Sequence, residues 1–151
     1  TKFGKLGVLV CEDLWHMSLP LLQGLKGAKV IIGIAVSPTR LALNSKSKIL
    51  KNYEINSEQH RAYARLLSIY MVFCNRVGYE DGVNFWGGSE IVDPFGTVDK
   101  VAKFFDEDMI TSEINMNSIK RARQLARHFL DEDVNFLRNE VQLLHDELAK
   151  I

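Results

Sequence analysis

The chain has 151 residues with 19 basic and 19 acidic side chains, so its formal net charge is zero, which excludes a general polyanion binder and predicts no nucleic-acid partner. The longest strongly apolar run, residues 28–36, is broken by Lys29 and Gly33 and is too short to span a bilayer, so no membrane partner is expected. Two cysteines are too few for a disulfide framework, and no signal peptide precedes the first strand, which together favour the cytoplasm.

The first part of the chain predicts a β-α-β unit. The apolar run Leu6–Val10 is typical of a buried strand that ends at Cys11. Leu14–Lys26 then predicts a helix, which Gly27 stops. Ala28–Val36 is rich in β-branched residues and predicts a second strand parallel to the first, followed by a loop over residues 37–47 that opens a basic stretch.

The middle of the chain predicts one long helix and several short strands. Asn56 or Ser57 is the expected N-cap of a helix that leads into a strand, Tyr70–Asn75. A glycine-punctuated loop is expected over residues 78–88, and three short strands are expected over residues 89–92, 98–104 and 109–114. The turn at residues 94–96 predicts that the first two of these form an antiparallel hairpin.

The last part of the chain predicts two helices. One is capped by Asn117 or Ser118 and runs to about residue 129, and the other begins at Asp131 or Asp133. In the second helix, apolar residues recur at spacings of three and four: Val134, Leu137, Val141, Leu144, Leu148 and Ile151. This stripe packs either against its own domain or against a partner subunit. We expect residues 1–115 to form one part of the fold, and residues 116–151 to form a helical extension and an interface.

Cys11 is the strongest chemical candidate. It follows a parallel strand directly, at the edge of the sheet where ligands bind in open α/β folds. A helix that begins nearby would favour a thiolate and could hold an oxyanion, so the thiol is either a nucleophile or a small buried core residue. Cys74 lies in an apolar strand and is expected in the core. His16 is a conceivable base for Cys11.

The remaining ionisable residues do not predict a metal or cofactor site. The four histidines have no metal-ligand spacing, and no Cys-x-x-Cys or His-Glu-x-x-His pattern is present in the sequence. The glycines at 82, 87 and 88 are not followed by the lysine of a phosphate-binding loop. We therefore expect no metal and no cofactor.

Three segments together resemble the nitrilase, or carbon–nitrogen hydrolase, superfamily. Residues 7–16 (GVLVCEDLWH) are similar to its nucleophile motif, in the version found in bacterial amidases and in the glutaminase domain of glutamine-dependent NAD synthetases. Residues 35–38 (AVSP) resemble the strand and loop after the nucleophile helix. Residues 75–82 (NRVGYEDG), 85–89 (FWGGS) and 94–96 (PFG) resemble the block that comes next.

The resemblance implies a fold, a reaction and an assembly. The fold would be α/β, the C-terminal part of an α-β-β-α sandwich ending in long C-terminal helices. The reaction would be hydrolysis of a non-peptide C–N bond in an amide, carbamoyl-amide or nitrile, through a cysteine thioester. Cys11 would be the nucleophile, and the backbone N–H of Glu12 would contribute to the oxyanion hole. A homo-oligomer is also implied.

The same resemblance implies which residues bind the substrate. Trp15, His16 and Ser37 would lie beside the cysteine, and Phe85 and Trp86 would line the acyl pocket. The alternative interpretation of the loop that contains Phe85 and Trp86 is structural: its glycines are needed only because the backbone turns tightly there. Asn75 and Arg76 are expected to be structural, with Arg76 paired to Glu80 or Asp81.

The sequence departs from the family pattern in one respect. In family members the catalytic glutamate and lysine precede the cysteine, and only ten residues precede Cys11 here. We therefore expect the N-terminal half of the same domain as a partner, and an inactive chain without it. The alternative function is that of a catalytically incomplete fragment that acts as a structural or assembly partner.

Overall fold

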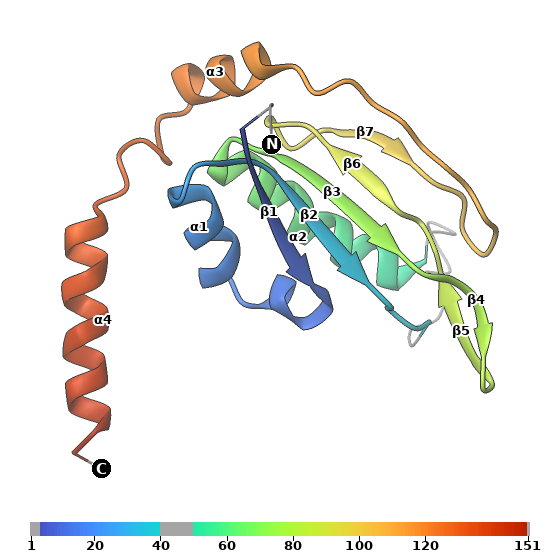
Figure 1. The fold of residues 1–151 in the computed structure, drawn as a ribbon, viewed down its shortest axis with the longest axis horizontal. Coiled ribbons are helices and arrows are strands. Elements are labelled where there is room, and N and C mark those ends of the chain that lie inside the picture. The colour runs from blue at the N-terminus through green and yellow to red at the C-terminus, as the bar shows by residue number, and fades with distance from the viewer. Residues whose placement is uncertain (1–3, 40–49, 151) are drawn as a thin grey trace.

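The structure, a computed structural model, describes residues 4–39 and 50–150 (Figure 1). Most of the loop expected at residues 37–47 and the last residue of the apolar stripe, Ile151, lie outside the described residues. A five-stranded sheet has the order β1-β2-β3-β6-β7, and a separate two-stranded ribbon pairs β4 with β5. These strands span Lys5–Val10 (β1), Ala28–Ala35 (β2), Tyr70–Asn75 (β3), Val77–Glu80 (β4), Val83–Trp86 (β5), Glu90–Val92 (β6) and Val98–Val101 (β7).

The predicted β-α-β unit is confirmed. β1 pairs with β2 and β2 pairs with β3, both in parallel. The single helix expected between β1 and β2 is wrong in detail, because a 3-10 helix, η1 (Cys11–Trp15), comes first and α1 covers only Ser18–Leu25. Pro20 fits this arrangement, since it stands in the first turn of α1, where a missing N–H costs nothing. Gly27 ends the segment with a φ of 95°.

Two helices cover one face of the sheet and build the main core. α1 and α2 (Lys51–Leu67) pack against β1, β2 and β3, and Figure 1 shows both on the same side of the sheet. Side chains from the strands, among them Ile31, Met71 and Phe73, meet Ala64 and Leu67 of α2 in one buried cluster. The alternation of the strands sends every second side chain into this layer.

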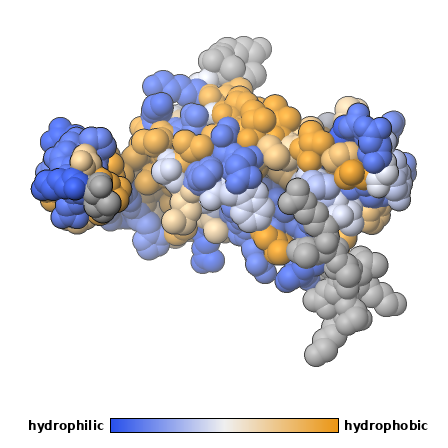
Figure 2. Space-filling view, turned by 90° about the horizontal axis from the view of Figure 1, so that it is seen from below, coloured by the Kyte–Doolittle hydropathy of each residue, from blue (hydrophilic) through white to orange (hydrophobic). Residues whose placement is uncertain are grey.

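The opposite face of the sheet is mostly bare. α3 (Met116–Leu125) covers only its amino end, where Ile119 packs with Val30 and Tyr70. Farther along, Val8 and Val10 of β1 are 51% and 58% exposed. Figure 2 shows apolar surface gathered along the upper side of the body.

Cys74 belongs to this bare face. The expectation that its thiol lies in the core is wrong, because the thiol is exposed. Cys74 stands beside Ile34 of β2, which is also exposed, whereas Phe73 points to the helices and is buried. The predicted strand is confirmed, but only one of its two faces is covered.

The start of α2 differs from the prediction of a cap at Asn56 or Ser57. The helix begins one and a half turns earlier, at Lys51, and both residues are buried inside it. Their polar groups are satisfied there, because Asn56 Nδ2 donates to the Asn52 carbonyl and Ser57 Oγ donates to Glu90. A polar side chain in a helix interior is tolerated when it has such a partner.

The segment expected to be a glycine-rich loop contains the β4–β5 hairpin. Its turn residues, Asp81 and Gly82, have φ values of 49° and 80°, which is the geometry of a two-residue hairpin turn. The predicted antiparallel pairing of β6 with β7 is confirmed. The strand expected over residues 109–114 is wrong, because no regular element spans these residues and Met109 is exposed.

The two C-terminal helices differ in how they pack. The cap of α3 is Asn115 rather than Asn117 or Ser118, and the helix ends at Leu125. The expected cap Asp133 of α4 (Val134–Leu148) is confirmed, since Asp133 Oδ1 accepts from two backbone N–H groups. No residue of α4 is buried, and the helix stands apart from the sheet in Figure 1. Within the described residues, no helix is both long and apolar enough to cross a membrane.

Candidate active site

Cys11 lies where three parallel strands end. It follows β1 directly, and the carboxyl ends of β2 and β3 lie beside it in the sheet. Cys11 has a φ of 49°, which an L-residue rarely adopts and which costs on the order of 1–3 kcal/mol when the surroundings impose it. The thiol is exposed at this turn. The backbone therefore changes direction sharply at the cysteine and presents its side chain at the edge of the sheet.

Three contacts hold the turn that carries Cys11. The Val10 N–H donates to Asp13 Oδ2 over 2.9 Å, which ties the start of η1 to its own third residue. Tyr63 Oη, from α2, donates to the Leu14 carbonyl over 2.9 Å. Leu14 is only 2% exposed and lies on Gly33 of β2, where a Cβ atom would come within 2.8 Å of Leu14 Cδ1. Gly33 thus allows η1 to approach the sheet closely.

A cavity of about 510 Å³ opens beside the cysteine. Its walls come from η1, from the end of β2 with the loop after it, and from α2 and β3: Cys11, Glu12, Leu14, Trp15, Ala35, Ser37, Pro38, Asn52, Ile55, Asn56 and Phe73. The structure therefore brings together four of the expected site residues, namely Cys11, Glu12, Trp15 and Ser37.

Glu12 lies on the same side as Cys11, which its place directly after an extended strand does not suggest. A neighbour of the cysteine in an extended strand would point away from it. Since η1 begins at Cys11, the two residues instead line the same cavity. The N–H of Glu12 lies in the first turn of this 3-10 helix, where no carbonyl of the helix is in place to accept it.

Ser37 is held by two hydrogen bonds from residues of neighbouring strands. Its backbone N–H donates to Asn75 Oδ1 over 2.8 Å, and its Oγ accepts from Trp86 Nε1 over 3.2 Å. Asn75 in turn donates from Nδ2 to the Gly87 carbonyl over 3.0 Å. The loop after β2 is thereby fixed relative to β3 and β5.

Three expected substrate-binding residues do not line the described cavity. Trp86 is fully buried behind the wall, where it donates a hydrogen bond to Ser37 and lies near the ring of Phe73. Phe85 pairs with the Pro38 backbone and lies 4.7 Å under the Arg76 guanidinium. His16 follows η1 and is exposed.

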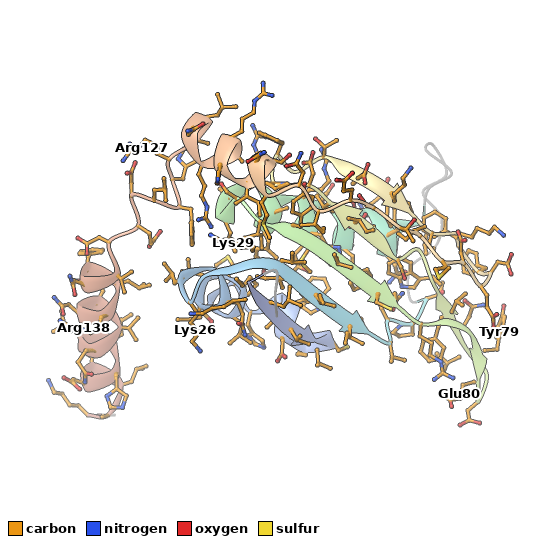
Figure 3. All side chains as sticks on the ribbon, turned by 45° about the horizontal axis from the view of Figure 1, so that its top comes forward. Lys26, Lys29, Tyr79, Glu80, Arg127 and Arg138 are labelled. Atoms are coloured by element: carbon orange, nitrogen blue, oxygen red, sulfur yellow. The ribbon has the colours of Figure 1, made fainter. Side chains whose placement is uncertain are left out.

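The hairpin that carries Phe85 extends away from the cavity, and Figure 3 shows Tyr79 and Glu80 near its far end. The expected ion pair of Arg76 forms there with Glu80.

A buried polar network that sequence reasoning missed lies behind the cavity. Glu90 Oε1 is 2.7 Å from His60 Nδ1, and Glu90 Oε2 accepts from Ser57 Oγ over 3.0 Å. His60 also stacks on Phe73, a wall residue, with ring centroids 4.3 Å apart. Burial, together with the nearby Glu90 carboxylate, raises the pKa of Tyr53 to about 12. No local sequence signal joins α2 to β6, because the pairing depends on the tertiary fold.

The family model described as carbon-nitrogen hydrolase matches residues 1–124. The chain belongs to the carbon-nitrogen hydrolase family. The chain is 33% identical over 116 residues to a glutamine-dependent NAD(+) synthetase of Thermotoga maritima, covering 75% of the chain and 18% of the synthetase. It is 27% identical over 131 residues to an N-carbamoylputrescine amidase of Oryza sativa subsp. japonica, covering 82% of the chain and 42% of the amidase.

Solved structures of carbon-nitrogen hydrolases have the same fold. A carbon-nitrogen hydrolase from Helicobacter pylori G27 superposes with a TM-score of 0.80 at 24% identity, covering 93% of this chain and 50% of that one. Nit3 of Saccharomyces cerevisiae, a nitrilase superfamily member, superposes with a TM-score of 0.68 at 26% identity, covering 83% and 43%. The chain thus spans half the length of these family members or less.

Proposed function

We propose that the protein containing this chain hydrolyses a non-peptide C–N bond through a thioester on Cys11. The observation that carries the proposal is the position of Cys11, on a strained turn at the carboxyl edge of the sheet and in the wall of a cavity. Membership of the carbon-nitrogen hydrolase family supports the reaction class. The substrate would be an amide, a carbamoyl-amide or a nitrile.

For an amide, the reaction has two steps. The Cys11 thiol loses its proton to a base as Sγ attacks the carbonyl carbon, and the carbonyl oxygen becomes an oxyanion. The C–N bond then breaks, the nitrogen leaves as ammonia or an amine after it gains a proton, and a thioester remains. Water attacks the thioester carbon, the C–S bond breaks, and the acid leaves while the thiol is restored. An amide is a poor electrophile, so donors placed for the oxyanion, here the N–H of Glu12, lower the barrier.

The proton transfers are assigned to groups outside residues 1–151. Among the described residues, Glu12 and Cys11 are the only ionisable side chains that line the cavity, and no lysine lines it. The family resemblance assigns the base and the lysine to positions before the cysteine. We therefore propose that the N-terminal half of the same domain supplies both.

The bare face of the sheet supports this partner. Val8, Val10 and Ile34 form an exposed apolar surface, and Val72 and Ile32 continue it toward α3. A contiguous apolar surface of this kind is uncommon on a monomer and is typical of an interface. We propose that a second sheet from the N-terminal half packs here, as in an α-β-β-α sandwich.

Ammonia release from the full-length protein tests the enzymatic proposal. A panel of a primary amide, a carbamoyl-amine, a nitrile and glutamine is offered to the wild type, to Cys11→Ser and to Cys74→Ser. We expect Cys11→Ser to lose release from the preferred substrate while its circular dichroism spectrum is kept. Cys74→Ser is the matched control, because it changes the other exposed thiol. Full activity in Cys11→Ser would refute the proposal.

The alternative function is a structural or assembly role without catalysis, and the bare apolar face favours it equally. The same panel separates the two. The assembly role predicts that Val8→Lys weakens association with the N-terminal half, whereas Cys11→Ser changes nothing that can be measured.

We also propose that residues 116–151 form an extension whose last helix pairs with a second copy of the chain. The apolar stripe of α4, which is exposed except for the half-buried Leu137, places valine at the first apolar position of its first two heptads, Val134 and Val141, and leucine at the second, Leu137 and Leu144. Valine followed by leucine in these positions favours two parallel strands.

Charges beside the stripe agree with a parallel pair. In this orientation Asp133 faces the partner's Arg138, and Glu140 faces the partner's His145, whereas an antiparallel pair would place Glu140 against the partner's Glu147. Figure 3 shows Arg138 on α4, away from the sheet. A Leu148→Cys variant should form an intermolecular disulfide between two copies of position 148. Absence of that crosslink under oxidation would contradict the parallel arrangement.

A further inference from the structure

Asn56 occupies the α2 wall of the cavity in a fixed orientation. Its side chain is 8% exposed, and its Nδ2 donates to the Asn52 carbonyl over 2.7 Å. The reverse orientation of the amide would bring Oδ1 against that carbonyl, and two acceptors would repel each other. The hydrogen bond therefore settles which end of the amide is free, and it is the acceptor end.

Asn56 Oδ1 has no hydrogen-bond partner among the described residues. The fully buried side-chain atoms that lack a partner there belong to Gln59, His60 and Arg123. Asn56 Oδ1 is not one of them, so it keeps contact with the space in front of it. Since Asn56 lines the cavity that contains Cys11, this space is the cavity.

The surroundings of Asn56 make an unpaired acceptor costly once a ligand displaces water. Leu14, Ile55 and Phe73 line the same cavity and are apolar. A ligand with no donor at this point would leave Oδ1 desolvated and unpaired, which costs more than a formed hydrogen bond gains. A ligand with an N–H at this point would satisfy it.

We propose that Asn56 is a specificity-determining residue that accepts a hydrogen bond from an N–H group of the bound substrate. The cavity then selects compounds with a carboxamide, ureido or ammonium donor over isosteres in which a methyl group replaces the nitrogen. This inference rests on the proposed function, because it assigns the substrate to the Cys11 cavity. It adds the recognition chemistry that neither Cys11 nor the Glu12 N–H provides, since both act on the carbonyl.

A binding experiment tests the inference without turnover. Full-length protein carrying Cys11→Ala is titrated by ligand-observed NMR with glutaramide and with heptane-2,6-dione, in which methyl groups replace both amide nitrogens. We expect glutaramide to bind about tenfold more tightly. Adding Asn56→Leu, similar in shape but without an acceptor, should reduce this ratio of dissociation constants about fivefold to tenfold, the size of one neutral hydrogen bond with its desolvation.

Asn117→Leu, an exposed change on α3, is the matched control and should leave the ratio unchanged. The same ratio in Asn56→Leu as in the control would overturn the inference. If Asn56→Leu does not fold, the two ligands are compared in the Cys11→Ala protein that keeps Asn56. Equal affinities of that protein for the two ligands would also overturn the inference. A failure of the proposed hydrolysis would be seen in a different measurement, as absent ammonia release from the full-length protein that keeps Cys11.

Discussion

Replacing Gly33 by alanine tests how the nucleophile turn is held against the sheet. A Cβ at this position would lie 2.8 Å from Leu14 Cδ1 and 3.1 Å from Met71 Cε. Neither neighbour is free to move far, because Leu14 and Met71 are both buried in the core. Leu14 must rotate or η1 must lift away from β2, and we expect Gly33→Ala to lower the free energy of unfolding by about 2 kcal/mol, the usual cost of overpacking.

The displacement should also reach Cys11, which lies three residues before Leu14 in η1. Urea unfolding measures the stability, and ammonia release measures the site. We expect the hydrolytic rate of Gly33→Ala to fall by more than tenfold, since small misplacements of reacting groups have large effects. Gly7→Ala is the matched control, because its Cβ would meet Ile31 and Gln23 at 3.1 and 3.2 Å, away from η1. It should cost less stability and keep the rate.

A second substitution identifies the clash. Leu14→Val alone removes one methylene and should cost about 1 kcal/mol. Combined with Gly33→Ala, the shorter side chain makes room for the new methyl group, so the two costs should not add. Additive costs, or a Gly33→Ala variant as stable as the wild type, would refute the account of η1 packing on Gly33.

Three further results are expected. Both Cys11→Gly and Cys11→Ala should lose ammonia release, but Cys11→Gly should be more stable in urea by about 1 kcal/mol, because only glycine relieves the φ of 49°; equal stabilities would contradict the strain. The pKa of Tyr53 is raised from 10.0 to about 12, so the stability contributed by its neutral phenol is complete below pH 10 and is lost as the pH rises toward 12. Tyr53→Phe should therefore lose less unfolding free energy than the wild type between pH 10 and 12. Leu137→Asp with Leu144→Asp should halve the mass seen by light scattering if α4 pairs two copies, and an unchanged mass would contradict the pairing. Asp133→Ala removes the N-cap of α4 and should weaken the helix by about 1 kcal/mol.

The parts of the fold set by local pattern could be predicted from the sequence. The strands at residues 5–10 and 28–35 follow from apolar, β-branched runs, and Gly27 stops the helix between them as expected. The hairpin β4–β5 could also have been predicted from the sequence. Its Asp81-Gly82 turn is a strong hairpin signal, but the surrounding glycines gave the impression of a loop.

Features that depend on distant contacts could not be predicted. Asn56 and Ser57 resemble helix caps because short polar side chains favour helix starts, and only the fold supplies Glu90 as a partner for Ser57. The candidate site shows the same division. Cys11 was evident from its strand and motif, whereas the acceptor role of Asn56 depends on a hydrogen bond within α2 and on a cavity wall.

The exposed thiol of Cys74 can be used to follow whether the open face of the sheet is covered. This thiol lies in the row of β3 and β2 side chains that none of the described helices covers. Alkylating reagents should reach it quickly while that row is open, and slowly once another layer of protein lies over it. The rate of labelling at this one sulfur, followed by mass spectrometry during expression and purification, therefore measures when the second layer arrives. Because an exposed thiol is open to oxidants, Cys74 should also be oxidised progressively in chains that have not yet bound the second layer.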